Sequence, residues 1–335
     1  MTGRGVPSGA QFEIRSGRHR ATLVEVGGGI RTYTYDGRPV LDGYPPEEMC
    51  SGARGTPLIP WPNRLADGAY TFDGTDHQVA LTEPEAHNAI HGFLRWRNWT
   101  PLETEPDRVV LGTVLHPLPG YPFTLGVTVD YRLRSGPSDD SRTSDPGRTG
   151  LTVATTATNM GAQRCPYGTG HHPYLRAGTE YIDDAELQMR AERWLPTDQR
   201  GLPTGTIPVA GSPYDFRGAR HIGDTIIDYA FTDLARDSDG LAWVVLTGPQ
   251  QQRTRLWADE HYRFIELYTG DTQPPDKRRR GLGVEPMTCA PNGLRSGNGL
   301  LTLEPGQSIT TRWGVEPDQP AGPHPHEIVR ERQPS

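Results

Sequence analysis

Apolar residues recur at every second position over much of this chain, which is the pattern of strands with one buried face. The clearest example is 125–133, LGVTVDYRL, where every odd-numbered position is apolar. The segment 151–159, LTVATTATN, alternates less regularly but is rich in β-branched residues. The same reasoning predicts further strands at 108–115, 241–248, 263–270 and 307–315. Long amphipathic helical windows are scarce, so the pattern predicts an all-β protein, a sandwich or a barrel.

Two polar segments interrupt this pattern. Residues 135–149, SGPSDDSRTSDPGRT, have no apolar side chain to bury and are predicted to form a surface loop. The strand pattern resumes unchanged after this loop, which favours one domain over residues 1–335, with its core at about 20–315, rather than two domains. Residues 317–335 are expected to form a flexible tail.

Composition agrees with many short strands, and the charge argues against a nucleic-acid partner. The 335 residues include 40 glycines and 32 prolines, which suits strands joined by turns. The net charge of −7 arises from mixed charges and lacks the basic footprint of a nucleic-acid binder. The one dense basic run, 277–280 (KRRR), is interpreted as a solvated loop.

Cysteine usage and the apolar runs indicate the compartment. Cys50, Cys165 and Cys289 are odd in number and widely spaced, which argues against a disulfide framework and against a cysteine zinc site. The first residues lack the apolar core of a secretion signal, and no apolar run is long enough to cross a bilayer. A cytoplasmic protein that does not associate with membranes is therefore expected.

Polar residues near aromatic ones mark two candidate binding segments. Asn63 and Arg64 follow the stiff sequence PWP and offer hydrogen bonds to a ligand rich in hydroxyl groups. His91 precedes Gly92 and a cluster of aromatic residues, a combination suited to sugars in a concave site. The alternatives are a loop-capping asparagine, a surface arginine and a half-buried histidine bonded to a carbonyl group.

The segment 171–175, HHPYL, contains two adjacent histidines. Pro173 disfavours helical geometry for His172 and extends the chain there. Neighbours in an extended chain point to opposite sides, so His171 and His172 are expected to have different tasks. One can face a site, where a histidine is suited to proton transfer near neutral pH.

Two acidic residues stand in apolar surroundings. Glu285 ends a short apolar stretch directly before Pro286, and apolar neighbours raise the pKa of a carboxyl group towards that of a useful base. Asp228 interrupts the apolar run IIDYAF, as a turn residue or as an acceptor pointing into a site. A surface glutamate at a strand end is the alternative for Glu285. A glutamate and a histidine together form an acid–base pair.

An ordered set of motifs resembles the aldose 1-epimerase (galactose mutarotase) family over about residues 20–315. In order along the chain, these motifs are NRLADGAYTFDG, AIHGFLRWRNW, HHPYL, IIDYAF, ELYTGD and VEPMTCAPNG. Each motif alone is weak, whereas the ordered set is specific. The resemblance implies a large antiparallel β-sandwich with a sugar in an open cleft. It also implies interconversion of the α and β anomers of an aldose without a cofactor.

The resemblance also assigns roles to site residues by motif. Glu285 matches the general base, His172 the general acid and His91 the second active-site histidine. Arg64 and Asp228 match residues that bind sugar hydroxyl groups, and Asn63 is a further candidate for the site. His171 departs from the pattern, and Phe93 replaces a commoner glycine beside His91.

Three alternatives remain open on the sequence alone. The first is a hexose 6-phosphate epimerase of the same fold that uses the run 277–280 to contact phosphate. The second is a non-catalytic sugar-binding module, which would not need both an acid and a base. The third is a metal enzyme with His91, His172 and Glu285 as ligands of zinc or iron. The preferred aldose, and whether the protein is a monomer or a homodimer, are also open.

Overall fold

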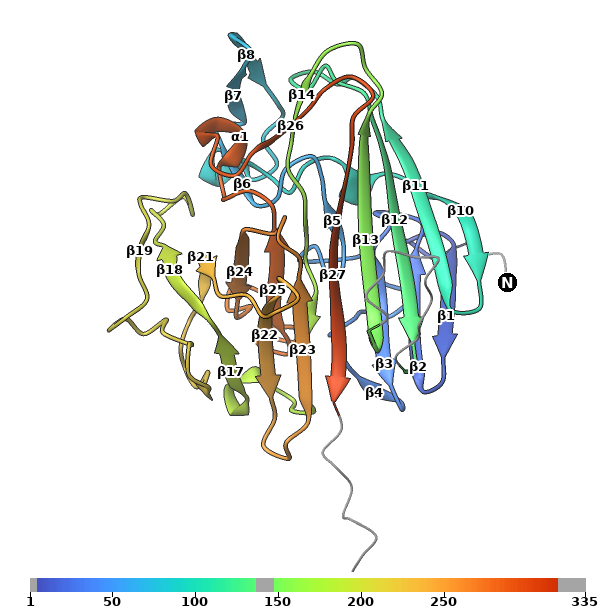
Figure 1. Cartoon of the computed structure of the whole chain (residues 1–335), viewed down its shortest axis with the longest axis vertical. Helices are drawn as coiled ribbons and strands as arrows, with labels where there is room; N and C mark the ends of the chain where they lie inside the picture. The colour runs from blue at the N-terminus through green and yellow to red at the C-terminus, as the bar shows by residue number, and fades with distance from the viewer. Residues whose placement is uncertain (1–4, 137–147, 319–335) are drawn as a thin grey trace, which may run out of the picture.

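The computed structural model describes residues 5–136 and 148–318, and nearly all of its regular structure is strand (Figure 1). The predicted all-β class is thereby confirmed. Most of the predicted polar loop and residues 319–335 of the predicted tail lie outside the described residues. The tail was predicted to begin too early, because residues 317 and 318 still pair with the neighbouring strand.

The largest sheet has nine antiparallel strands (Figure 1). Their order is β10 (Thr100–Glu105), β11 (Arg108–Leu115), β12 (Leu125–Arg134), β13 (Gly150–Asn159), β27 (Ser308–Asp318), β23 (Arg253–Ala258), β22 (Ala242–Thr247), β17 (Glu186–Met189) and β20 (Arg220–His221). Five of the six predicted strands belong to this sheet. The buried positions of β12 are the odd-numbered residues through Leu133, as the alternation predicts.

A second sheet of eight strands carries the chemistry described below. Its order is β19 (Ile207–Pro208), β18 (Ala191–Leu195), β21 (Asp228–Leu234), β24 (Phe264–Tyr268), β25 (Leu282–Met287), β15 (Gly170–His171) and β5 (Pro57–Leu58), with β16 (Tyr174–Leu175) also paired to β25. The strand predicted at 263–270 is β24. The other predicted strands lie in the nine-stranded sheet, so the sequence pattern identified strands in both sheets.

Smaller elements complete the described part of the chain. A four-stranded N-terminal sheet packs against β11 and β12 and consists of β1 (Gln11–Ser16), β2 (His19–Val24), β3 (Ile30–Tyr35) and β4 (Arg38–Pro39). The two-stranded pairs are β6 (Arg64–Ala66) with β9 (Asn88–Ile90), β7 (Ala69–Phe72) with β8 (Thr75–Gln78), and β14 (Cys165–Tyr167) with β26 (Leu301–Leu303). The helical turns are η1 (Pro84–Ala86), η2 (Leu94–Trp96), η3 (Ile182–Asp184) and α1 (Gly293–Ser296).

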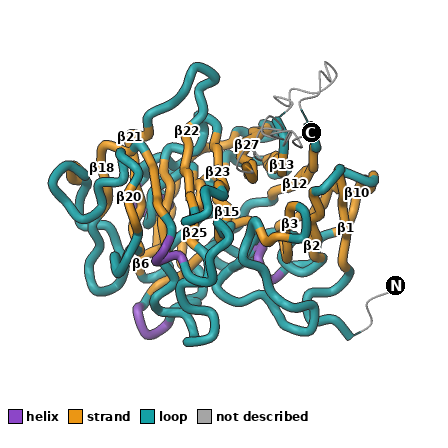
Figure 2. The backbone as a smooth tube through the Cα atoms, turned by 90° about the horizontal axis from the view of Figure 1, so that it is seen from below, coloured by secondary structure: helices purple, strands orange, loops and turns teal. Residues whose placement is uncertain are grey.

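The sheets share one continuous core. Its main cluster of buried apolar residues extends from Ile14 to Val315 and draws on the N-terminal, nine-stranded and eight-stranded sheets. Seen end-on, the strands form stacked layers joined by long loops (Figure 2). Cys50, Cys165 and Cys289 are buried free thiols. No helix within the described ranges is long and apolar enough to cross a membrane.

Candidate active site

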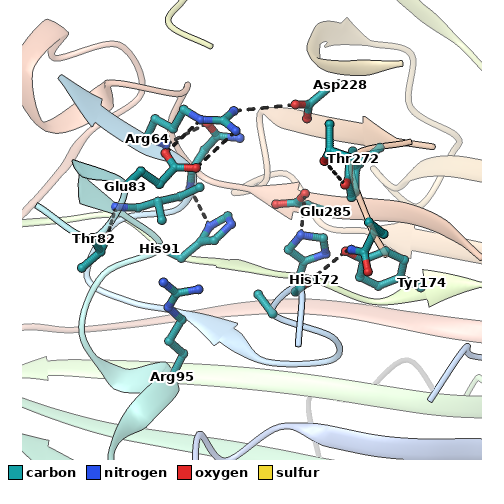
Figure 3. Close-up of a pocket in the computed structure, with 16 residues that line it drawn as sticks. Arg64, Thr82, Glu83, His91, Arg95, His172, Tyr174, Asp228, Thr272 and Glu285 are labelled. Atoms are coloured by element: carbon teal, nitrogen blue, oxygen red, sulfur yellow. Dashed lines mark hydrogen bonds and ion pairs between the residues drawn. The ribbon is translucent and has the colours of Figure 1, made fainter. Parts of the chain in front are cut away.

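A pocket of about 290 Å³ opens beside the eight-stranded sheet (Figure 3). All six site residues proposed from the sequence line it, namely Asn63, Arg64, His91, His172, Asp228 and Glu285. They come from separate parts of the chain: the segment before and within β6, the end of β9, the turn before β16, and strands β21 and β25. The fold therefore brings together the set that spacing alone could not place.

His172 and Glu285 form a buried pair of ionisable groups in the pocket wall. His172 Nε2 lies 3.1 Å from Glu285 Oε1, and the two side chains are 6% and 3% exposed. The imidazole stacks on the Tyr174 ring at 4.8 Å between centroids, with the planes 6° apart. The backbone of His172 is held by hydrogen bonds to Gly55 and Thr56. Both members of the pair are thus fixed on the walls of the pocket.

Burial shifts the pKa values of this pair in opposite directions. It lowers the pKa of His172 to about 3, with a further contribution from the positive charge of Arg54. It raises the pKa of Glu285 well above its usual range, and the charge of Asp228 adds to this shift while Arg64 opposes it. Both shifts favour the uncharged forms, a neutral imidazole beside a protonated carboxyl group, and the two facing atoms are close enough to exchange a proton.

Tyr174 is held in place by a chain of polar contacts. Its hydroxyl donates to the carbonyl oxygen of Gly52 at 2.9 Å and accepts a bond from Gln273 Nε2 at 3.1 Å. Gln273 Oε1 in turn accepts from Arg54 Nη1 at 3.0 Å. The Arg54 guanidinium lies 4.6 Å above the Tyr174 ring. This network supports the face on which His172 stacks, and the sequence reasoning did not identify it.

His91 occupies an unusual backbone position that fixes its tautomer. It has a φ of +62°, and the following Gly92 has a φ of +63°. The backbone N–H of Asn63 donates to His91 Nδ1 at 3.1 Å. Nδ1 is thus an acceptor, so the imidazole proton sits on Nε2. Burial keeps the pKa of His91 well below its usual value, so the ring is a neutral hydrogen-bond donor.

The donor atoms of His91, His172 and Glu285 lie within 4.8 Å of one another, close enough for a metal site. A metal bound at His91 Nε2 would require the ring proton on Nδ1, where the amide proton of Asn63 already points. His91 Nδ1 is itself used by that hydrogen bond. The three residues therefore fit a metal ion poorly, and a role in proton transfer suits them better.

Arg64 is positioned by carboxylates on two sides. Its Nε donates to Glu83 Oε2 at 3.1 Å, and its Nη1 lies 3.8 Å from Asp228 Oδ2 (Figure 3). Asn63 accepts a bond from the backbone N–H of Arg64 through its side-chain oxygen at 2.7 Å. Asn63 is thus a residue that shapes the segment as well as one that lines the pocket. Glu83 was not predicted, because no pattern around it distinguishes it from a surface glutamate.

Two other missed residues lie within motifs that the sequence contains. Arg95, from AIHGFLRWRNW, lines the pocket near His91 (Figure 3). Its Nε is buried and has no hydrogen-bond partner among the described residues. Glu266, the first residue of ELYTGD, lies opposite Glu285 on the neighbouring strand, outside the pocket lining, and is 2% exposed. Both motifs contributed to the resemblance, so position within a motif was the signal that could have found these residues.

His171 and the basic run 277–280 lie outside the pocket lining. His171 Nε2 is 2.8 Å from the Thr155 hydroxyl, and its ring packs against Trp313 at 5.2 Å. In the basic run, Lys277 pairs with Glu48 at 2.6 Å, and Arg279 pairs with Asp271 and Asp183. The sequence alternative in which this run contacts a phosphate in the site therefore lacks structural support.

Comparison with known protein families gives a match over most of the chain. The family model described as "Aldose 1-epimerase" matches residues 10–315. This chain belongs to the aldose 1-epimerase family. The resemblance inferred from the ordered motifs is thereby confirmed.

Individual relatives and solved structures agree with this membership. The Escherichia coli (strain K12) protein named "Uncharacterized protein YihR" is 35% identical over 301 residues, or 90% of this chain and 91% of that protein. The aldose 1-epimerase of the same strain is 32% identical over 226 residues, or 62% of this chain and 58% of that protein. The crystal structure of the GalM/aldose epimerase homologue from C. elegans has a TM-score of 0.79 at 16% identity and covers 92% of this chain and 98% of that chain. The last comparison confirms the predicted β-sandwich fold.

Proposed function

We propose that this protein is an aldose 1-epimerase that interconverts the α and β anomers of an aldohexose such as glucose or galactose. The observation that carries the proposal is the buried His172–Glu285 pair, 3.1 Å apart in the wall of the pocket. Ligand pockets usually measure about 300–1,000 Å³. A pocket of about 290 Å³, close to the lower limit of that range, suits a single sugar ring.

The geometry suits acid–base opening of the ring. The anomeric hydroxyl and the ring oxygen are bonded to the same carbon, so their acid and base must lie close together. Glu285 takes the proton of the anomeric hydroxyl while His172 donates a proton to the ring oxygen, and the bond between C1 and the ring oxygen breaks. Rotation next to the resulting aldehyde exposes its other face. Reclosure with the two groups in exchanged roles yields the other anomer and restores both protons.

Binding of the sugar selects the reactive form of the pair. The proton that this pair exchanges must reside on His172, and the negative charge on Glu285, when the ring opens. An anomeric hydroxyl that donates to the carboxylate stabilises this arrangement. The reaction transfers protons only, so it needs no redox cofactor. Each correctly placed acid or base contributes about 10²–10⁴-fold to the rate.

The remaining pocket residues supply bonds to sugar hydroxyl groups. His91 Nε2–H, Arg64 and Arg95 are donors, and Asp228 is an acceptor. A purely sugar-binding module would use this set but would not need a buried acid and base in contact. The run 277–280, which was the predicted contact for the phosphate of a 6-phosphate substrate, does not line the pocket. The mutarotase hypothesis therefore has the most support.

Polarimetry of freshly dissolved α-D-glucose and α-D-galactose tests the proposal. We expect wild type to accelerate the decay to the anomeric equilibrium and Glu285→Gln to lose at least about 100-fold of that activity. Glu48→Gln is the matched control, because Glu48 is a carboxylate that pairs with Lys277 outside the pocket lining. Circular dichroism checks that each variant is folded.

The outcomes separate the alternatives. No acceleration on either free sugar but rapid mutarotation of glucose 6-phosphate would replace the proposal with the phosphorylated substrate. Sugar binding in calorimetry without turnover on any of the three would indicate a binding module. Full activity in a folded Glu285→Gln variant would remove this residue from the mechanism.

A further inference from the structure

Two buried glutamates lie side by side on neighbouring strands, and one of them, Glu285, lines the pocket. Strands β24 and β25 pair in a register that places Glu266 directly opposite Glu285. Directly opposed residues of an antiparallel pair project to the same face, with Cβ atoms about 4.5–5.5 Å apart. Each of the two residues is 2% exposed. The sheet thus holds two carboxyl groups together away from water.

A third carboxyl group joins them from the next strand. β21 pairs with β24 so that Ala230 lies opposite Glu266, which puts Asp228 on the same face and diagonal to Glu266. This register brings the Asp228 and Glu266 carboxyl groups close enough to interact. Two carboxyl groups can share a hydrogen bond only when one of them carries a proton.

Positive charge near these groups is limited. The groups that face Glu266 are Asp228 from β21, Glu285 from β25, Arg64 from β6 and the Asn63 side chain, which hydrogen-bonds to it. Arg64 is the one cation in this set, and it already pairs with a fourth carboxylate, Glu83. Like charges at this spacing in a buried site cannot all ionise. At least one of the three carboxyl groups must therefore hold a proton.

The surroundings of each carboxyl group indicate which of the three holds the proton. Burial raises the pKa of Asp228, but the nearby charge of Arg64, 3.8 Å away, opposes this shift, and the side chain is 43% exposed, which favours the ionised form. Glu285 contacts His172, with which it can exchange a proton. Glu266 is enclosed, and its Oε2 has no partner among the described residues. Burial raises the pKa of Glu266 well above its usual range, and the charges of Asp228 and Glu285 raise it further.

We propose that Glu266 is the carboxyl group that stays protonated while Glu285 acts as the base. It is a positioning residue, because it does not line the pocket and acts through Glu285 and Asp228. Its neutral state avoids a second buried negative charge beside the base, and its O–H can donate to the Asp228 carboxylate. The role beside the base rests on the proposed function, whereas the protonation of Glu266 does not.

This arrangement has a consequence at alkaline pH. If Glu266 lost its proton, its charge would make Glu285 hold an accepted proton more tightly. Return of that proton to the sugar would slow, and turnover would fall as pH rises. Glutamine has the shape of a protonated glutamate and no charge to gain. Glu266→Gln should therefore retain turnover near neutral pH and lose the part of the alkaline decline that Glu266 causes.

Infrared spectroscopy tests the protonation without using turnover. The wild type near neutral pH should show a protonated-carboxyl band that loses intensity in Glu266→Gln and keeps its intensity in Asp228→Asn. The same intensity of this band in folded wild type and Glu266→Gln would overturn the proposal. Carboxyl-¹³C glutamate labelling gives a second test that leaves Glu266 in place. One resonance should remain at the protonated position at neutral pH in Glu285→Gln, and its absence there would also overturn the proposal.

Kinetics test the functional part separately. We expect kcat/KM of Glu266→Gln to lie within about threefold of the wild-type value at neutral pH. The alkaline limb of its pH–rate profile, where kcat/KM declines, should lie at higher pH than in wild type. An unchanged alkaline limb, or a 100-fold loss at neutral pH in a folded variant, would contradict the positioning role. A wild type that has no mutarotase activity would instead contradict the proposed function, and the spectroscopic result would still stand.

Discussion

The two adjacent histidines show how one residue position separates chemistry from packing. His172 faces the pocket beside Glu285, whereas His171 lies on the other side of the chain against Thr155 and Trp313. The alternation of side chains along extended backbone predicted this division. It follows that equal substitutions at the two positions should affect different properties of the protein.

We therefore predict opposite outcomes for His172→Asn and His171→Asn. The first should lose at least about 100-fold in kcat with little change in stability, because it removes the proposed acid. The second should keep most of kcat and lose about 1–3 kcal/mol of stability, because it breaks a buried hydrogen bond. Polarimetry and urea unfolding measure the two effects. A folded His172→Asn with near wild-type turnover would contradict the assignment.

The stability deficit of His171→Asn should also depend on pH. Burial lowers the pKa of His171 from its usual value of 6.5 to about 3. Between these values the unfolded chain binds a proton that the folded protein does not, so acid removes stability that His171 contributes to wild type. The deficit of the variant should shrink by about 1.4 kcal/mol for each pH unit below about 6.5. Unfolding curves at pH 7 and pH 5 provide the test, and an equal deficit at both would contradict it.

At the scale of elements, a tight turn after β9 places His91. Gly92 has a φ of +63°, and a Cβ atom there would lie 2.0 Å from the carbonyl oxygen of Ile59. The close approach of these two backbone segments brings the Asn63 N–H to His91 Nδ1. Glycine is needed at this position because it adopts a positive φ readily and because it has no side chain to collide with Ile59.

Gly92→Ala should therefore be more harmful than an alanine at another glycine with positive φ. Gly74, in the turn between β7 and β8, has a φ of +75° and open space around it. Gly74→Ala should lose about 1–2 kcal/mol from the backbone conformation alone. Gly92→Ala should lose more, because the collision adds to this, and should reduce kcat by displacing His91. Thermal unfolding and polarimetry compare the two, and equal losses would refute the role assigned to the close approach.

At the scale of the whole molecule, one core connects the sheets that build the pocket. The main apolar cluster includes Ile14 in the N-terminal sheet, Val129 in the nine-stranded sheet and Ile265 in the eight-stranded sheet. Such a continuous core should unfold as a unit. This supports the single domain predicted from the sequence.

Calorimetry tests this prediction. We expect a single thermal transition whose calorimetric and van't Hoff enthalpies agree. Glucose or galactose, if bound in the pocket, should raise the midpoint of the whole transition, because ligand binding stabilises the folded state. Two separable transitions, of which only one responds to the sugar, would show that the chain contains two independent units.

The sequence by itself determined the strand class, most of the long strands and the opposite directions of His171 and His172. These features depend on local backbone geometry, in which side chains alternate and proline restricts its neighbour. The ordered motifs also identified six residues that the fold brings to one pocket. Their proposed roles come from family resemblance.

Only the tertiary structure decided the neighbours of those residues. The pairing of Glu266 with Glu285 depends on strand register, and the pairing of Arg64 with Glu83 depends on how distant segments meet. The His91 tautomer is set by the backbone of Asn63, 28 positions away in the sequence. Burial and charge pairing act through space between segments that are far apart in the chain. No local pattern of residues specifies them, and they set the protonation states on which the proposed chemistry depends.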